Sequence, residues 1–288
     1  MKRNLILLWL CFLGFVTTSS AQSDSLQVVK ANWKVQRIAP GVKWKQYWFN
    51  QSLFKANQNI NILEIKPKRK LWLDLGYEPQ ELKSTSSFGQ EANALATLNG
   101  TFFDVKNGGS VDFIRADGRI INESRLGNSG NRAPHQRSAL IFNKGKLLIA
   151  KWDGTPDWEK NLAGEDVMVS GPLLILNKKT EVLDSSAFNR TRHPRTAVAI
   201  TNHNRILFIT VDGRQEQSAG MSLFELRDVL RWLNTRDGIN LDGGGSTTLW
   251  IKGQPDNGIV NYPSDNKKWD HAGERKVANV VLVKRRRR

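Results

Sequence analysis

The stretch TAVAITNHNRILFITVDG, from Thr196 to Gly213, contains two nearly continuous apolar runs separated by a short polar turn. Apolar runs of five or six residues that are rich in β-branched side chains are typical of strands covered on both faces. The segment PLLIL, Pro172 to Leu176, has the same character. These runs predict the buried centre of a large sheet, because a surface strand would alternate apolar and polar residues.

Shorter strands are predicted on both sides of this centre. The segments Val42–Phe49 and Asn59–Lys66 alternate, and Leu71–Leu75 follows them. Two hairpins are indicated by turn residues between apolar runs, with Asp117-Gly118 inside residues 111–122 and Lys144-Gly145 inside residues 138–150. The segment KVANVVLV, residues 276–283, predicts a last buried strand.

Helices are few in this pattern. Ser222 and Glu225 form a capping box before a stripe of leucines in SLFELRDVLRWL. A second helix is predicted to start at Ser87, with Gln90 as its capping partner, and to end near residues 97–104. Few helices among many strands indicate an α+β fold, a single domain on large mixed β-sheets spanning residues 22–288.

The first 21 residues have the organisation of a signal peptide. Lys2 and Arg3 precede an apolar run from Leu5 to Val16, and small residues at positions 19–21 supply a cleavage site. The run is too short to span a bilayer, although an uncleaved anchor is the alternative. We expect an exported protein with no transmembrane segment in the mature chain. Its only cysteine, Cys11, would be removed, which leaves no disulfide or thiolate chemistry.

The chain is strongly basic, with a formal net charge of +16. Residues 284–288, KRRRR, form a tail that is either a solvated terminus or a contact for an anionic partner. The remaining positive charge is spread along the chain and favours anionic ligands in general. We expect no nucleic-acid partner, because the chain has no motif typical of DNA or RNA recognition.

Polar residues gather where the predicted strands begin or end. The clearest group is INLDGGGSTTLW, residues 239–250, in which Gly243, Gly244 and Gly245 follow Asp242 and precede Ser246 and Thr247. Consecutive glycine N–H groups can form a concave nest for phosphate oxygens, and the two hydroxyls would add donors. The alternative is a tight connection without a ligand. A Walker loop is excluded, because the lysine is missing and a strand follows.

Two aspartates and one arginine are the other candidates. Asp212 and Asp242 both follow strands, and such a pair suits glycoside hydrolysis or a divalent cation, although Asp-Gly is also a common turn former. Arg195 opens a buried strand, where its guanidinium would bind a phosphate or form a salt bridge at the sheet edge. No cofactor is required by these residues, and whether a metal binds stays open.

Six ordered blocks resemble the phosphodiester glycosidase family. They lie between Asn93 and Val283 and read LNGTFFD, SGPLLI, HPRTAVAI, VDGR, GMSLFELRDVLRWL and NLDGGGSTTLW. The resemblance implies hydrolysis of a sugar-1-phosphate diester at the glycosidic bond. It also implies that the family's polar positions fall on Asn99, Arg195, Asp212, Asp242, Gly243, Gly244 and Ser246.

The substrate implied by this resemblance is a phosphorylated glycan or glycoconjugate. Catalysis would be carried by Asp242, Asp212 and Asn99, and phosphate would be held by Arg195 and residues 243–247. Thr101 stands where a glycine is common in the family, which leaves the identity of the sugar open. Two alternatives remain at this point. They are a metal-dependent phosphodiesterase that cleaves the P–O bond and a non-catalytic envelope protein that binds anionic glycans.

Overall fold

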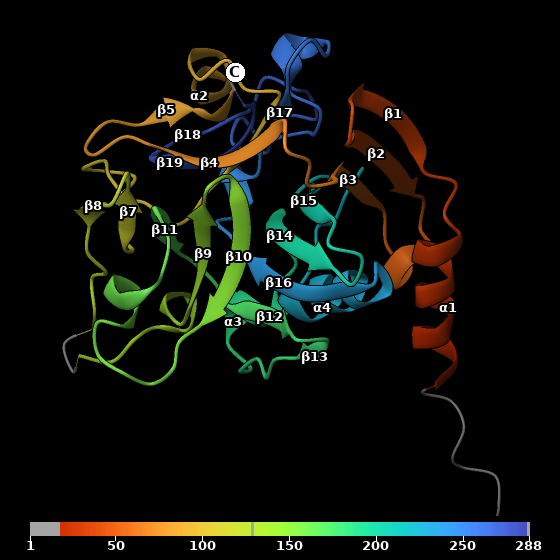
Figure 1. Ribbon diagram of the computed structural model, residues 1–288. Helices are drawn as coiled ribbons and strands as arrows, with labels where there is room; N and C mark the ends of the chain where they lie inside the picture. Colours follow the sequence, from red (N-terminus) through yellow and green to blue (C-terminus); the bar gives the residue numbers. More distant parts are fainter. Residues whose placement is uncertain (1–17, 128–129, 287–288) are drawn as a thin grey trace, which may run out of the picture.

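Strands dominate the chain, as Figure 1 shows for the computed structural model. The structure describes residues 18–127 and 130–286, with side chains from Ser23 onward. The predicted apolar run of the signal peptide and the last two arginines of the tail lie outside the described residues. Helix α1 (Thr18–Lys30) includes the predicted cleavage site at positions 19–21.

An eight-stranded sheet forms the centre of the molecule. Strand β14 lies between β15 and β16 and is antiparallel to both. Across the sheet, the order is β1 (Lys34–Ala39), β2 (Val42–Phe49), β3 (Gln58–Ile65), β15 (Ile206–Val211), β14 (Arg195–Thr201), β16 (Thr235–Asn240), β12 (Leu173–Leu176) and β13 (Lys179–Thr180).

Three smaller sheets complete the strand structure. A five-stranded sheet has the order β10 (Lys146–Lys151), β9 (Ser138–Asn143), β11 (Asp166–Val169), β7 (Ile114–Ala116) and β8 (Arg119–Asn122). A four-stranded sheet has the order β17 (Leu249–Ile251), β6 (Ala96–Asn99), β19 (Asn279–Arg285) and β4 (Leu71–Tyr77). The last is the pair β18 (Lys276–Val277) and β5 (Lys83–Ser84).

One apolar core joins the three large sheets. Val198 and Phe208 of the central sheet, Leu98 and Val281 of the four-stranded sheet, and Leu140 of the five-stranded sheet all belong to it. The opposite face of the central sheet is covered by helices α4 and α1, which contact one another (Figure 1). Because all three sheets share this core, they form one domain.

Helices and short turns of 3-10 helix lie around the sheets. The α-helices after α1 are α2 (Thr85–Glu91), α3 (Ala187–Arg190) and α4 (Leu223–Trp232). The 3-10 helices are η1 (Leu53–Lys55), η2 (Pro134–Gln136), η3 (Trp158–Asn161), η4 (Gly244–Ser246) and η5 (Asp256–Gly258). None of the helices in the described ranges is long and apolar enough to cross a bilayer.

The α+β prediction and most of the predicted elements are confirmed. Residues 42–49 form β2, and both hairpins turn at the expected Asp-Gly and Lys-Gly pairs. The capping box of α4 is present: the Ser222 hydroxyl accepts from the Glu225 N–H, and the Glu225 carboxylate accepts from the Ser222 N–H. The strand pairings of the described residues are all antiparallel, so the sheets are more uniform in direction than the expected mixed sheets.

The prediction for the second helix is wrong at both ends. Helix α2 begins at Thr85, because the hydroxyl of Ser84 accepts the N–H of Ser87 and caps it three residues earlier than expected. It ends at Glu91, and Asn93 then takes a positive φ of 48°. Residues 96–99 form strand β6, whose pairing with β17 and β19 overrides the helical continuation.

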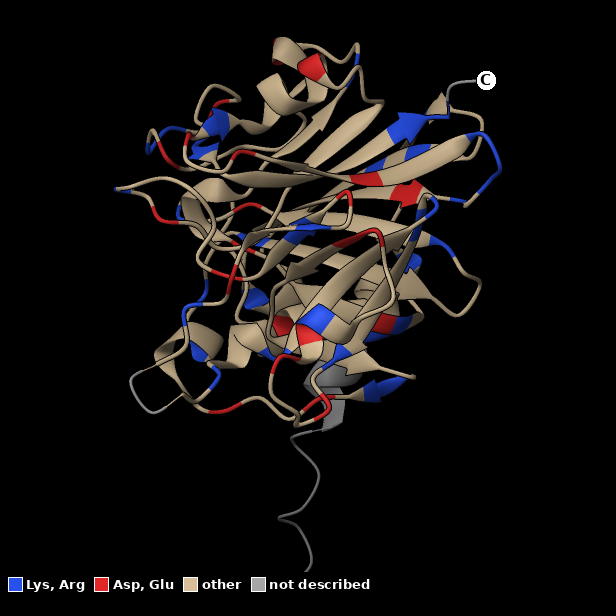
Figure 2. Ribbon diagram, turned by 60° about the vertical axis from the view of Figure 1, so that its left-hand side comes forward, with Lys and Arg blue, Asp and Glu red and all other residues tan. Residues whose placement is uncertain are grey.

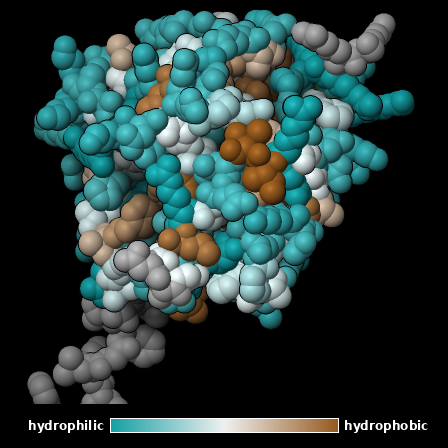
Figure 3. All heavy atoms as spheres, turned by 90° about the vertical axis from the view of Figure 1, so that its left-hand side faces the viewer, coloured by the Kyte–Doolittle hydropathy of each residue, from teal (hydrophilic) through white to brown (hydrophobic). Residues whose placement is uncertain are grey.

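Charge is distributed over the whole surface, in agreement with the sequence. Figure 2 shows basic and acidic positions interspersed along strands and loops, with basic positions also gathered near the C-terminus. The face seen in Figure 3 is mainly hydrophilic and carries a few separate apolar groups. The mean hydropathy of −0.45 fits this surface.

Candidate active site at one end of the central sheet

Four of the predicted residues come together at one end of the central sheet. Arg195 is the first residue of β14, and it pairs with Val211, the residue before Asp212. Asp242 follows β16, the other neighbour of β14. Asn99 is the last residue of β6 and reaches this end from the four-stranded sheet. The antiparallel order of β15, β14 and β16 therefore brings the predicted residues to one place.

Asp242 is held by Asn99, the last residue of β6, and by Gly100, which follows it. Its N–H donates to the carbonyl of Gly100 at 3.0 Å, and its own carbonyl accepts from Asn99 Nδ2 at 2.7 Å. The side chain is half-buried. Burial raises the pKa of Asp242 to about 6, while a hydrogen bond from Ser246, the charges of Arg275 and Arg214 and the Gly243 N–H oppose the rise.

Glycine is required at these three positions for two reasons, close packing at Gly243 and Gly245 and backbone conformation at Gly244. A Cβ atom on Gly243 would lie 2.6 Å from the carbonyl oxygen of Pro194. Gly244 has a φ of +61°, a left-handed conformation that glycine adopts without strain. A Cβ on Gly245 would lie 2.5 Å from the carboxylate of Asp265. The loop is therefore pressed against β14 on one side and against the loop containing Asp265 on the other.

Only part of this loop is available as an anion cradle. The N–H of Gly244 donates to the carbonyl of Pro194 at 2.9 Å. In contrast, the N–H groups of Gly243 and Gly245 form no backbone hydrogen bond within the described ranges. The Gly243 N–H also acts on the Asp242 carboxylate, so the predicted cradle retains one glycine donor, the N–H of Gly245.

Two arginines that the sequence analysis did not single out border the loop. A Cβ on Gly244 would lie 2.9 Å from Nη2 of Arg214, and a Cβ on Gly245 would lie 2.6 Å from Nη2 of Arg275. Arg214 is exposed, and Arg275 is half-buried and donates from Nε to Asp265 at 2.8 Å. Arg214 is the last residue of the VDGR block. Its position in that block could have indicated a role, but nothing else in the sequence separates it from the other basic residues.

Arg195 lies deeper than the prediction required. It is 2 % exposed, and its Nε donates to the Met221 carbonyl at 2.8 Å. Its Nη2 donates to the carbonyls of Phe188 and Thr191, both at 2.8 Å. Burial, with the charge of Arg214, lowers the pKa of Arg195 to about 10. Two of its three nitrogens are therefore used to order the chain around the site.

Asp212 is also committed to the protein. One carboxylate oxygen accepts from Asn59 Nδ2 at 2.9 Å, and the other accepts from Asn261 Nδ2 at 2.9 Å and from the Tyr262 N–H at 3.0 Å. Burial raises the pKa of Asp212 to about 7, against the effect of these hydrogen bonds. Asp212 thus ties β15 to β3 and to the loop at residues 261–262.

Asn99 and Thr247 form the floor of the site. Asn99 is buried, and its Oδ1 accepts from Thr196 Oγ1 at 2.8 Å and from the Thr248 N–H at 3.0 Å. Thr196 Oγ1 also lies 3.3 Å from Thr247 Oγ1. Both the Oδ1 and the Nδ2 of Asn99 are hydrogen-bonded to other protein groups. This arrangement suits a residue that positions Asp242.

A second carboxylate, Asp112, lies near enough to Asp242 to sense its charge. It is fully buried, its Oδ1 accepts from Gln136 Nε2 at 2.9 Å, and His135 Nε2 lies 3.5 Å from the same oxygen. Burial raises the pKa of Asp112 to about 7, and the charge of Asp242 adds to the rise. In the sequence, Asp112 lies at the start of a predicted hairpin, and nothing there indicates that it lies near Asp242.

An aromatic pair lies next to Asp212. Tyr262, whose N–H donates to that aspartate, stacks on Trp269 with ring centroids 4.0 Å apart. Trp250, next to the glycine loop in sequence, is 3 % exposed and belongs to the core, so it does not contribute to the site's surface. Across the described residues, no group of three or more His, Cys, Asp or Glu side chains is arranged to hold a metal ion.

A sequence model of the phosphodiester glycosidase family matches residues 92–284, which include every residue of this site except Asn59. The chain belongs to the phosphodiester glycosidase family. This confirms the resemblance found in the six ordered blocks. The family match contains the carboxylates, the glycine loop and both bordering arginines.

Curated relatives carry the name N-acetylglucosamine-1-phosphodiester alpha-N-acetylglucosaminidase. The mouse protein is 26% identical over 196 residues, covering 64% of this chain and 36% of its own length. The human protein is 32% identical over 210 residues, covering 67% of this chain and 38% of its own length. The chain thus spans less than two fifths of the length of these two relatives.

Solved structures share the fold. The catalytic domain of the zebrafish N-acetylglucosamine-1-phosphodiester alpha-N-acetylglucosaminidase, auto-inhibited by its pro-peptide, superimposes with a TM-score of 0.65 at 20% identity and 88% coverage of each chain. A hypothetical protein from Synechocystis gives a TM-score of 0.66 at 16% identity, covering 89% of this chain and 64% of its own. The family match and these structures agree on one fold.

Proposed function

We propose that this phosphodiester glycosidase hydrolyses a sugar-1-phosphate diester at the bond between the anomeric carbon and oxygen, leaving a phosphomonoester. The observation that carries the proposal is the position of Asp242, whose carboxylate stands beside a glycine loop bordered by Arg214 and Arg275. A carboxylate next to an anion receptor suits a reaction in which positive charge develops on the sugar while a phosphate departs.

The leaving phosphate needs a receptor more than it needs a proton. Arg214 and Arg275 bring two guanidinium groups to the glycine loop, and the N–H of Gly245 adds a donor without a backbone partner in the described chain. Arg195 contributes positive charge, and its hydrogen bonds to backbone carbonyls fix the chain around the site. Ser246 and Thr247 follow the loop and complete the proposed phosphate site.

Asp242 and Asp112 take the two remaining catalytic roles. Asp242, with a pKa of about 6, is ionised near neutral pH and serves as the nucleophile or as the base that activates water. Asp112, with a pKa of about 7, keeps its proton longer and supplies acid–base assistance. Asn99 holds the Asp242 backbone, and Asp212 ties β15 to β3 and to the loop at residues 261–262, so neither reacts itself.

Hydrolysis in ¹⁸O-labelled water tests the bond that breaks, with N-acetylglucosamine-1-phosphate esterified to a methyl group as the probe. The proposal expects the label on the sugar and none in the phosphate. Label in the phosphate, together with loss of turnover in EDTA, would establish a metal-dependent phosphodiesterase instead. Binding of the probe without release of product at any pH from 4 to 9 would establish a non-catalytic binder.

We also propose that the protein is exported and acts on a phosphorylated glycan or glycoconjugate. The support is the sequence of residues 1–21 and the basic surface, with net charge +16. Cleavage after Ala21 would leave Val28 of α1 in its contact with α4, because that residue belongs to the second core. N-terminal sequencing of the protein from an intact cell envelope checks this, and a chain that still begins at Met1 in the cytosol contradicts it.

A further inference from the structure

A cavity of about 600 Å³ lies at the other end of the central sheet. It opens where β3 and β14 end and β15 begins, at Ile65, Ile200 and Ile206. The candidate active site lies where β15 ends, so the six residues of that strand, or roughly 17–20 Å, separate the two places. The cavity is therefore independent of the proposed catalytic reaction.

The walls of this cavity are apolar and come from all three large sheets. Ile65, Ile200 and Ile206 belong to the central sheet, Leu73 to the four-stranded sheet and Leu147 to the five-stranded sheet. All five are also members of the shared core. These core residues form the closed floor of the cavity, and Leu71, Trp72 and Leu148 add apolar surface that a ligand can reach. This apolar surface favours a hydrocarbon ligand over water.

The rim of the cavity is basic. Its lining contains no aspartate or glutamate, whereas six cationic residues take part: Lys68, Arg69, Lys144, Lys146, Arg236 and Arg286. Arg236 is paired with Asp237 at 2.8 Å. For Lys68, Arg69, Lys144 and Lys146, the described part of the chain offers no carboxylate within salt-bridge distance. A cationic rim of this kind attracts an anion and repels a cation.

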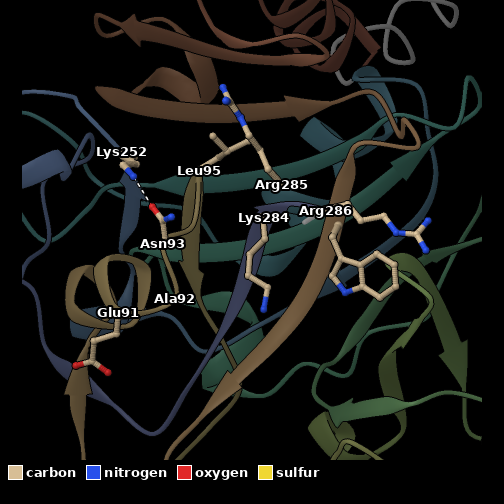
Figure 4. Close-up of a pocket in the computed structure, with 9 residues that line it drawn as sticks. Glu91, Ala92, Asn93, Leu95, Lys252, Lys284, Arg285 and Arg286 are labelled. Carbon is tan, nitrogen blue, oxygen red and sulfur yellow. Dashed lines mark hydrogen bonds between the residues drawn. The ribbon is translucent and has the colours of Figure 1, made fainter. Parts of the chain in front are cut away.

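The neighbouring cleft extends the positive surface. Its volume is about 820 Å³, and it shares Trp72 and Arg286 with the cavity. The Arg286 guanidinium lies 5.3 Å from the centre of the Trp72 ring. Figure 4 shows Lys252 bonded to Asn93 and Lys284 close by on β19, where Lys284 also pairs with Asp74. Because both lysines already have partners, we do not treat this cleft as a second binding pocket. Lys252, whose partner is a neutral amide, adds positive charge beside the cavity.

We propose that the cavity binds a single-chain anionic amphiphile. Its hydrocarbon chain would lie against Leu71, Trp72 and Leu148, which are half-buried or exposed, and its phosphate or carboxylate head would meet the lysines and arginines of the rim. The volume is within the range of small-molecule sites, about 300–1,000 Å³. Apolar walls alone would accept any lipid, and the rim without an acidic residue selects the anionic head.

Isothermal titration calorimetry of the full chain tests the proposal, with dodecyl phosphate below its micelle concentration as the probe. We expect saturable binding of one equivalent at this site. Dodecyltrimethylammonium, which has the same chain and the opposite charge, and inorganic phosphate, which has no chain, should each bind at least about tenfold more weakly. Equal binding of the two amphiphiles, or of inorganic phosphate and dodecyl phosphate, would overturn the proposal.

Variants locate the binding. Lys68→Glu with Lys146→Glu should weaken dodecyl phosphate binding by about tenfold or more, because two rim charges are reversed. Lys34→Glu with Lys179→Glu, at exposed positions of strands β1 and β13, makes the same charge change away from the cavity and should leave binding unchanged. Arg214→Ala separates the cavity from the active site: binding that persists in this variant supports the proposal, and binding that disappears with Arg214 assigns it to the catalytic end.

Discussion

Asn99 Nδ2 donates to the backbone carbonyl of Asp242 at 2.7 Å, so the end of strand β6 determines where the Asp242 carboxylate stands. The neighbouring Gly100 carbonyl accepts the Asp242 N–H and completes the clamp. These two hydrogen bonds join the four-stranded sheet to the central sheet at the candidate active site. A carboxylate held by two sheets keeps its position while charge develops on a bound substrate.

Asn99→Ala should lower kcat by roughly 10- to 100-fold, because a small displacement of a catalytic carboxylate is costly. The free energy of unfolding should fall by about 1–3 kcal/mol, since Thr248 N–H and the Asp242 carbonyl lose their partner. Kinetics and urea denaturation measure both effects. Asn107→Ala, which replaces an exposed asparagine bonded to Asp104, is the matched control. Unchanged kcat in Asn99→Ala would remove the clamp from the mechanism.

Asp242→Asn and Asp212→Asn should separate chemistry from structure. Asp242→Asn should reduce kcat by about 10³-fold or more while raising stability above pH 7, because burial disfavours the ionised carboxylate. Asp212→Asn should cost about 2–4 kcal/mol of stability, since an amide NH₂ would face donors on Asn59, Asn261 or Tyr262. Thermal unfolding and single-turnover kinetics distinguish them, and the reverse pattern would exchange the two roles.

The pH profile of kcat/KM should be bell-shaped. Activity should rise as Asp242 loses its proton near its pKa of about 6 and fall as Asp112 loses its proton near its pKa of about 7. Asp112→Asn should abolish the alkaline limb and keep the acid limb. Because the two groups interact, the measured values belong to the pair. A profile of unchanged shape in Asp112→Asn would exclude that residue as the acid.

Stability should fall as pH rises from about 5 to 8. The folded protein holds protons on Asp212, Asp112 and Asp242 at pKa values of about 7, 7 and 6, whereas the unfolded chain releases them near its ordinary value of 3.8. The native state therefore binds more protons in this window, and the unfolding free energy decreases with pH. The melting temperature across this range measures the slope, and a rising melting temperature would contradict it.

Gly243→Ala should impair catalysis more than Gly244→Ala. The new methyl group at position 243 would meet the Pro194 carbonyl, which is fixed at the start of β14, whereas at position 244 it would meet the mobile end of the Arg214 side chain. Both substitutions also test stability, with Gly244→Ala expected to cost about 1–2 kcal/mol for its positive φ. Gly253→Ala has a positive φ with open space around it and serves as the control.

Local sequence signals predicted the elements that are stabilised locally. The capping box of Ser222 and Glu225 and the turn at Asp117-Gly118 depend on residues within a few positions of one another. A strand before Asp242 was expected, but the extent of β16, TRDGIN, was not predicted, because its polar residues give no apolar run. Its place beside β14 comes from the tertiary fold. Helix α2 was predicted too far along the chain for the same reason, since the pairing of β6 overrides helical periodicity.

The sequence by itself determined that carboxylates, glycines and basic residues gather at strand ends, and its ordered blocks identified the family. It did not distinguish Asp212 from Asp242, because each aspartate precedes a glycine after a strand, and it singled out Arg195 rather than Arg214. The tertiary structure distinguishes the surroundings of these residues. Asp212 and Arg195 are buried among donors and carbonyls that satisfy them, whereas Arg214 remains exposed beside the glycine loop and Asp242 half-buried. Burial and hydrogen-bond partners depend on contacts between distant segments, which no local pattern records.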